Sequence, residues 1–223
     1  LKKYIETLSK DTDAFGFLEV DPELERKLEV LLPEFQPIYN QGIKMNYGGG
    51  VIGGRSVFAK NSLKIINKEF VSIYDIGPKD AGGMIYTELR VGGKKISLGV
   101  VHGKSLPGDK LDTPERLEQS NRIIDFFSKI DGSKIIGGDF NLLPETQSIK
   151  MFEEAGYRNL IKEYEIKSTR NQISWDNFKD FPGFVKQYFA DFAFVSPDIK
   201  VKSFEVPYVE VSDHLPLILD FDI

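Results

Sequence analysis

The segment KIIGGDFNLLPET, residues 134–146, has the clearest structural pattern in the sequence. Its apolar pair Ile135 and Ile136 predicts a buried strand, and the two glycines that follow allow backbone or substrate to approach closely. Asp139 and Asn141 come next, two positions apart, so strand geometry would direct both side chains to the same side. A carboxylate and an amide at a strand end suit a site that holds a water and a phosphate.

The same letters are equally typical of an Asx-turn that only ends a strand, and the segment alone leaves both interpretations open. Pro144 then predicts the start of a helix with Glu145 in its first turn, because proline suits the first helical position and acidic side chains suit a helix N-terminus. Other parts of the sequence are needed to decide whether this segment is a functional site or a turn that only ends the strand.

The composition is that of an ordinary globular protein. Of the 223 residues, 41% are hydrophobic and 28% are charged, which excludes a disordered chain and leaves room for one large domain or two small ones. There is no cysteine, which excludes disulfides, thiolate zinc sites and cysteine nucleophiles. The net charge of −5 gives no strong attraction to a nucleic-acid backbone.

No apolar run approaches the length that a membrane-spanning helix needs. The sequence begins at Leu1, without methionine and inside a helical pattern, so a signal peptide cannot be judged from it. We expect a soluble protein with the cytoplasm as its favoured location, and the sequence leaves the oligomeric state open.

The pattern of apolar residues predicts a single domain over residues 1–223, because no repeat, low-complexity tract or linker interrupts it. A hairpin is expected around Gly92 and Gly93, and a mobile loop at residues 46–50. Helices are expected at residues 1–10, 21–32, 113–130 and from 144 to about 156. Strands are expected at residues 14–20, 35–39, 51–59, 63–74, 84–90, 95–101, 135–136, 188–195, 200–206 and 217–221. Many strands with few helices between them favour a mixed, layered α/β fold.

Polar residues stand at the ends of several of these strands, and both histidines of the chain are among them. If the strands share one sheet edge, these side chains converge on one pocket. They are Glu19, His102, Asp139, Asn141, Asp191, Asp213 and His214.

Such a set suits metal-assisted hydrolysis of a phosphate ester. Glu19 and Asp213 are hard oxygen ligands of the kind that Mg²⁺ prefers. His214, held by a carboxylate, is a candidate base or proton donor. Asn141 and His102 are candidate donors to phosphate oxygens.

Each residue also has a structural interpretation. Glu19 can mark the solvent end of a strand, and His102 can be a histidine satisfied within a turn. Asp191 is different, since it lies in the apolar run YFADFAFV, where an unpaired carboxylate is costly, and this favours a function. A zinc site lacks the HExxH spacing, and a Ser-His-Asp triad for acyl transfer lacks the GxSxG elbow.

Together these motifs resemble the endonuclease/exonuclease/phosphatase superfamily, which has the deoxyribonuclease I-like fold. The resemblance implies a four-layer αββα sandwich, two packed mixed β-sheets flanked by helices, that hydrolyses phosphate esters with Mg²⁺ or Mn²⁺. It covers nearly the whole chain, and GDFN followed by SDHLPL is its most specific part. The segments that carry it, in order, are AFGFLEV, VVHG, GGDFN, YFADFAFVS and SDHLPL.

The resemblance also implies metal-binding residues and a branch of the superfamily. Glu19 resembles its metal-binding glutamate, and Asp213 resembles an aspartate of the metal site. His102 resembles the second histidine of the deoxyribonuclease and phosphodiesterase branches.

For the reaction itself, the resemblance implies that Asp139 positions or activates the attacking water and that Asn141 contacts the phosphate. Asp191 resembles the residue that orients and charges the terminal histidine, here His214.

Two departures accompany the resemblance. Leu18 precedes Glu19 where the superfamily usually has glutamine. The superfamily's first strand, which carries an active-site asparagine, has no counterpart in the sequence, and whether it exists upstream of Leu1 is left open.

The favoured function is therefore that of a Mg²⁺-dependent phosphodiesterase or phosphohydrolase. A small molecule or nucleotide is favoured as substrate over long nucleic acid, since the chain is acidic and lacks lysine and arginine clusters. A DNA or RNA endonuclease of the same fold is the alternative, and a catalytically silent binding module is the second. Trp175 either stacks on substrate or packs internally, whereas Lys104 and Arg170 are expected to be surface charges.

Overall fold

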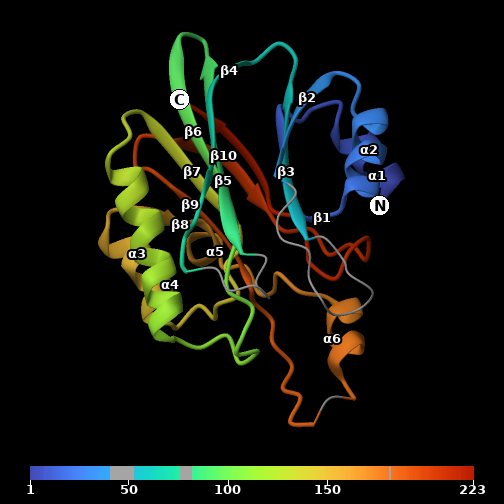
Figure 1. Ribbon diagram of the computed structural model, residues 1–223, viewed down its shortest axis with the longest axis vertical. Coiled ribbons are helices and arrows are strands. Elements are labelled where there is room, and N and C mark those ends of the chain that lie inside the picture. The colour runs from blue at the N-terminus through green and yellow to red at the C-terminus, as the bar shows by residue number, and fades with distance from the viewer. Residues whose placement is uncertain (41–52, 76–81, 181) are drawn as a thin grey trace.

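The computed structural model describes residues 1–40, 53–75, 82–180 and 182–223. The loop predicted at 46–50 and the first two positions of the strand predicted at 51–59 lie outside these residues. The described chain forms four layers, with two packed β-sheets between two outer layers of helices (Figure 1). The predicted α/β sandwich is confirmed.

The first sheet has three antiparallel strands in the order β1–β3–β2. These are β1 (Ala14–Val20), β2 (Phe35–Asn40) and β3 (Gly54–Lys60). Helices α1 (Lys2–Leu8) and α2 (Pro22–Leu31) lie on its outer side (Figure 1). Asp21 caps α2, and its carboxylate accepts hydrogen bonds from the backbone nitrogens of Glu23 and Leu24 at 2.9 and 2.7 Å.

The second sheet has six strands in the order β4–β5–β6–β7–β9–β8, and the β6–β7 pair is parallel. Its strands are β4 (Lys64–Val71), β5 (Gly83–Val91), β6 (Lys94–His102), β7 (Ser133–Asp139), β8 (Arg158–Asn159) and β9 (Asp191–Val195). The predicted hairpin joins β5 to β6, and Gly92 and Gly93 supply its two positive φ angles of 56° and 83°. A separate antiparallel pair consists of β10 (Lys200–Glu205) and β11 (Ile218–Asp222).

Helices α3 (Pro114–Ser128) and α4 (Gln147–Glu154) form the other outer layer (Figure 1). The segment 158–182, which the sequence pattern leaves unassigned, contains β8, α5 (Leu160–Glu163) and α6 (Gln172–Phe178). Within the described ranges, no helix combines the length and apolar character that crossing a bilayer requires.

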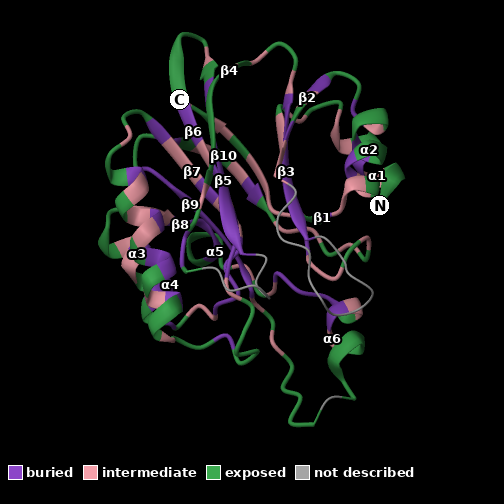
Figure 2. Ribbon diagram, viewed as in Figure 1, coloured by how far each residue is buried: buried purple, intermediate pink, exposed green. Residues whose placement is uncertain are grey.

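The core lies beneath α3 and α4, and Figure 2 colours many residues of the central strands as buried. Phe140 packs edge-on against Phe152 and Phe194, with ring centroids 5.5 Å apart in both pairs. Phe152 stacks on Phe194 at 4.3 Å. Each buried ring stabilises the fold by roughly 1.5–3 kcal/mol relative to an exposed one, so the strand that ends at Asp139 is firmly held.

Several predicted boundaries are wrong, and the strand predicted at 63–74, for example, ends at Val71. The helix after the central strand begins at Gln147, not at Pro144, because Asp112 caps it from a distant loop and accepts from the nitrogens of Gln147 and Ser148 at 2.7 and 2.9 Å. Strand β9 begins at Asp191 and not at residue 188, because the carbonyl of Tyr188 bonds to the segment 169–170 instead of to a strand.

The cap predicts a stability effect. We expect Asp112→Ala to lower the free energy of unfolding by about 1 kcal/mol, since two helix-end nitrogens lose their acceptor. Asp125→Ala is the matched control, because Asp125 makes only an exposed ion pair with Lys129 within α3, and its loss should cost less than about 0.5 kcal/mol. Urea unfolding of both variants measures the difference, and equal midpoints would contradict the assignment of the cap.

Candidate active site

Three central strands place their polar ends side by side. In the parallel pair of β6 and β7, His102 lies opposite Asp139, and in the antiparallel pair of β7 and β9, Asp139 lies opposite Asp191. All three are buried. The pairing register alone therefore brings together residues that are far apart in sequence.

The turn after Asp139 departs from the expected strand geometry. Strand β7 ends at Asp139, and Asn141 has a left-handed backbone with φ of 54°. Its backbone nitrogen donates to Asp139 Oδ1 at 2.8 Å, and its side-chain Nδ2 donates to Asp139 Oδ2 at 3.1 Å. The two side chains thus meet through an Asx-turn rather than through the alternation of a strand, as the structural interpretation of the segment predicts.

Gly103 lies against this turn and must be glycine. Its nitrogen donates to Asp139 O at 2.6 Å, and its carbonyl accepts from Asn141 Nδ2 at 3.3 Å. A Cβ atom there would lie 2.3 Å from the carbonyl oxygen of Phe140. The loop after β6 is therefore drawn tightly onto the turn after β7.

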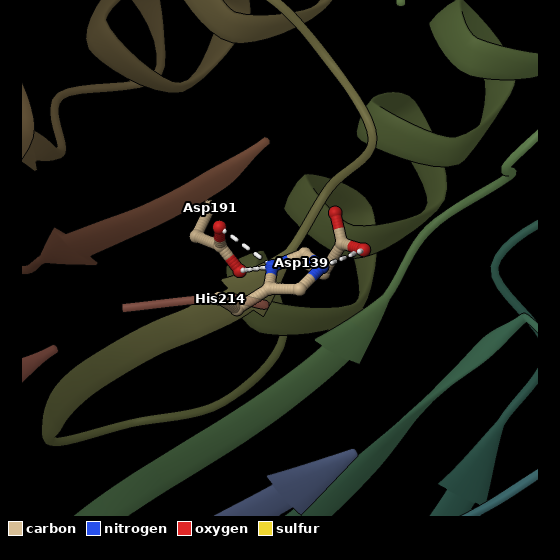
Figure 3. A group of neighbouring side chains, drawn as sticks. All are labelled: Asp139, Asp191 and His214. Atoms are coloured by element: carbon tan, nitrogen blue, oxygen red, sulfur yellow. Dashed lines mark hydrogen bonds and ion pairs between the residues drawn. The ribbon is translucent and has the colours of Figure 1, made fainter. Parts of the chain in front are cut away.

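His214 connects the two aspartates (Figure 3). Its Nδ1 lies 2.8 and 2.9 Å from the two carboxylate oxygens of Asp191, and its Nε2 lies 3.8 Å from Asp139 Oδ2. Because Asp191 accepts the proton on Nδ1, the imidazole is oriented with Nε2 facing Asp139. Nε2 is then the atom at which a proton is gained or lost.

Charge controls the protonation of this histidine. Burial alone would lower the pKa of His214, but the carboxylates of Asp191 and Asp139 outweigh it and raise that pKa to about 9. Arg170 opposes them, since its Nη1 lies 2.9 Å from Nε2, a contact that suits an unprotonated Nε2. The ring can therefore hold either state, with the carboxylates favouring the imidazolium.

Burial also acts on the pKa values of Asp139 and His102. Burial would raise the pKa of Asp139, but His214 and Lys110 overcome it and lower that pKa, so the carboxylate is ionised. Burial lowers the pKa of His102, against the opposing effect of Asp139, so this ring is neutral. Its Nδ1 is buried and has no hydrogen-bond partner within the described part of the chain.

Glu19 reaches the site through a distortion of its strand. The register between β1 and β3 shifts between Leu18 and Val20, and Glu19, at the bulge, has a φ of 56°. Its side chain is 75% exposed, and Oε1 lies 3.9 Å from His102 Nε2. A bulge re-aims the side chain of the extra residue, which here faces the second sheet.

Asp213 lies close to both His214 and Arg170. Its Oδ2 is 3.7 Å from Arg170 Nη2 and 3.9 Å from His214 Nε2. Among the described residues, the group whose ligand atoms lie within 4.8 Å of one another, as a metal ion requires, is Asp139, Asp191 and His214. Glu19 and Asp213 are outside that group.

The prediction that Arg170 is a surface charge is wrong. Arg170 is buried, forms an isolated bridge with His214 and donates through Nε to Ser174 Oγ at 2.7 Å. Its neighbours fasten the same region, because Thr169 Oγ1 accepts from the backbone nitrogen of Asp191 at 3.2 Å and Asn171 Nδ2 donates to Ser212 O at 2.7 Å. No local pattern marks these residues, since their partners are distant in sequence.

Lys110 is a second residue that the sequence pattern does not reveal. It is buried, and its Nζ donates to Asn141 Oδ1 at 2.5 Å. Trp175, by contrast, is half-buried, donates through Nε1 to Gln187 O at 2.8 Å and has the ammonium of Lys186 3.5 Å from its ring centroid. These contacts favour the packing interpretation of Trp175.

Comparison with known proteins places this geometry in context. The sequence model of the Endonuclease/Exonuclease/phosphatase family matches residues 1–214. No curated protein gives a significant match. Among solved structures, an endonuclease/exonuclease/phosphatase from Bacteroides vulgatus is similar, with 19% identity, a TM-score of 0.76 and coverage of 100% of this chain and 90% of that one.

Two further structures illustrate the range of the fold. A mannosyl-6-phosphatase from Bacteroides thetaiotaomicron is similar with 18% identity, a TM-score of 0.73 and coverage of 100% of this chain and 89% of that one. TDP2 from D. rerio, complexed with a single-strand DNA product, is similar with 15% identity, a TM-score of 0.72 and coverage of 99% and 89%. At these identities the likeness shows the fold.

The pKa of His214 is directly testable, because the chain has only two histidines. In the metal-free protein we expect its ring protons to titrate near pH 9 in an NMR experiment, with His102→Gln used for assignment. Asp191→Asn should bring the pKa to 6.5 or below, whereas Asp125→Asn should leave it unchanged. A wild-type titration near 6.5 would contradict the electrostatic assignment.

The raised pKa of His214 also determines how the stability of the protein depends on pH. Since the folded pKa is raised above 6.5, protonation of His214 stabilises the folded protein. That contribution is complete below about pH 6.5 and is lost as the pH rises through about 9. Asp191→Asn should flatten this part of the stability profile.

Proposed function

Because the chain belongs to the endonuclease/exonuclease/phosphatase family, we propose that it is a metal-dependent phosphoric-ester hydrolase that uses an activated water for in-line attack on phosphorus. The observation that carries the proposal is the row formed by Asp191, His214 and Asp139. A buried carboxylate orients a histidine whose other ring nitrogen, Nε2, faces a second, ionised carboxylate. This is an arrangement for moving a proton at a defined position.

The roles follow from the contacts. Asp139 is the acceptor that positions the attacking water, since its carboxylate is ionised and its Oδ2 faces Nε2 of His214. His214 in its imidazolium form donates to the phosphoryl group, and Asp191 holds the ring in place. Asn141 and His102 are donors to phosphate oxygens, the latter through Nε2.

The residues also offer oxygen ligands for a divalent cation, although Glu19 and Asp213 lie outside the group whose ligand atoms are within 4.8 Å of one another in this structure. Glu19 is exposed at a strained bulge beside the buried site, and Asp213 is half-exposed beside His214, so both offer the hard oxygen ligands that Mg²⁺ prefers. When bound, Mg²⁺, or Mn²⁺ in its place, would polarise the phosphoryl group and offset its charge. Asp139 is the third candidate ligand, because Asp191 is committed to His214.

We favour a small phosphate ester as substrate. The acidic chain offers little attraction to a long polyanion. A mannosyl-6-phosphatase and a protein complexed with single-strand DNA share the fold, so a nuclease is the second candidate. A silent binding module is disfavoured, because such a module has no need of a buried carboxylate, histidine and carboxylate in a row.

The proposal predicts turnover of bis-p-nitrophenyl phosphate with Mg²⁺, and loss of that turnover with a chelator. Asp139→Asn and His214→Ala should each lower kcat by a factor of about 10²–10⁴, since each removes a proton-transfer group. Asp125→Asn, on the exposed face of α3, is the matched control. Unchanged kcat in both site variants, with the fold verified by circular dichroism, would overturn the assignment.

The substrate class needs a separate experiment. We expect faster turnover of small phosphate esters than of plasmid DNA when both are assayed in Mg²⁺ at physiological salt. Nicking of the plasmid that persists at this salt concentration and disappears in Asp139→Asn would establish the nuclease instead.

A further inference from the structure

The loop between β6 and α3, residues 103–112, is built around one buried cation. The guanidinium of Arg116 is completely buried, and its Nη1 donates to Leu111 O at 2.6 Å and to Asp109 Oδ1 at 3.2 Å. The same guanidinium also donates to the backbone carbonyls of Lys104, Ser105 and Pro107. Few side chains other than arginine can bond to so many acceptors at once, so the conformation of this loop depends on Arg116.

The loop is fastened to the active site on its other side. The carbonyl of Lys110 accepts from the nitrogen of Leu143 at 3.0 Å, and Gly103 is bonded to Asp139 O. At the start of the loop, Gln119 accepts from the nitrogen of Lys104 at 2.8 Å and donates to Phe140 O at 3.2 Å. The loop therefore has a fixed position relative to the turn after β7.

Lys110 is held in a strained conformation at this point. Its φ is 60°, which is uncommon for a residue with a side chain. Within the described residues, four non-glycine residues have a positive φ, and three of them, Glu19, Lys110 and Asn141, contribute side chains to the site. Strain of this kind clusters where function requires a side chain in one place.

The ammonium of Lys110 has donors to spare. It is 7% exposed and bonds to Asn141 Oδ1, with no carboxylate within ion-pair distance in the described part of the chain. A lysine has three N–H donors, so two are left for an incoming group. The carboxylates of Asp139 and Asp191 act on this buried ammonium from a distance, but neither is in contact with it. Because a buried cation is costly without an anion in contact, an incoming anion would complete its environment.

We propose that Lys110 binds the phosphate of the substrate and that Arg116 is the positioning residue that holds Lys110 there. This inference rests on the proposed function, because it assigns a further residue to the same site. Lys110 approaches the phosphate from the side of Asn141, so the amide and the ammonium act on it together. Arg116 does not touch substrate and acts only through the loop.

The first experiment measures phosphate binding and turnover. Lys110→Met keeps the length of the side chain and removes its charge, so it should abolish binding of inorganic phosphate in calorimetry and lower kcat/KM about 10²-fold. Lys110→Arg should recover part of both. Lys129→Met, at the far end of α3, is the matched control and should resemble wild type. A Lys110→Met variant with wild-type phosphate affinity and kcat/KM would overturn the proposal.

The second experiment separates positioning from general stability by a double-mutant cycle. Arg116→Met should lower kcat/KM in the wild-type background and have no further effect in the Lys110→Met background. Arg122→Met is the control arginine on the same helix, ion-paired but not part of the loop. Equal losses in both backgrounds would overturn the positioning role. If Arg116→Met does not fold, Asp109→Ala removes one acceptor of Arg116 and serves in the same cycle.

The two proposals fail in different ways. If the wild-type protein turned over none of the phosphate esters, the hydrolase proposal would be contradicted. Even then, phosphate binding that is lost in Lys110→Met but kept in Lys129→Met would support a phosphate-binding lysine. Wild-type turnover that Lys110→Met retains would contradict the lysine and leave the hydrolase standing.

Discussion

The pairing register of β6, β7 and β9 is the constraint on which the rest of this site depends. It places His102, Asp139 and Asp191 in one row, so a shift of one residue would turn these side chains to the opposite face of the sheet. The register is held by the packing of Phe140 and Phe194 beneath α4, which would be lost with any slip. The chemistry of the site is therefore stabilised by an apolar core in which none of its polar groups takes part.

The buried charges of the site are tolerable because they come in opposed pairs. Asp191 lies against His214, and Asp139 lies within the field of His214 and Lys110, which keeps it ionised although it is buried. Arg170 limits the rise in the pKa of His214, because its guanidinium faces Nε2 of that ring. Buried charges and shifted pKa values of this kind are typical of functional sites, in agreement with the phosphate ester and the metal ion that we propose to bind here.

The deoxyribonuclease I-like sandwich positions this set from both sheets, and three of the candidate side chains stand on irregular backbone. Glu19 lies at a bulge, Asn141 in an Asx-turn and Lys110 in a loop wound around Arg116. Regular strands fix where each segment ends, and the strained residues then turn their side chains toward a common point. The first sheet contributes Glu19, so the site spans the two layers.

The sequence by itself determined the layered fold and most of the strands, because the alternation of apolar residues is a local property. It also marked Asp191, since a carboxylate in an apolar run needs a partner. The tertiary structure alone decided the positions of Arg170 and Lys110, whose contacts with His214 and Asn141 join residues 44 and 31 positions apart. It likewise decided the start of α4, which Asp112 caps from 35 positions away. Such contacts have no local pattern, because they exist only once distant strands have been paired.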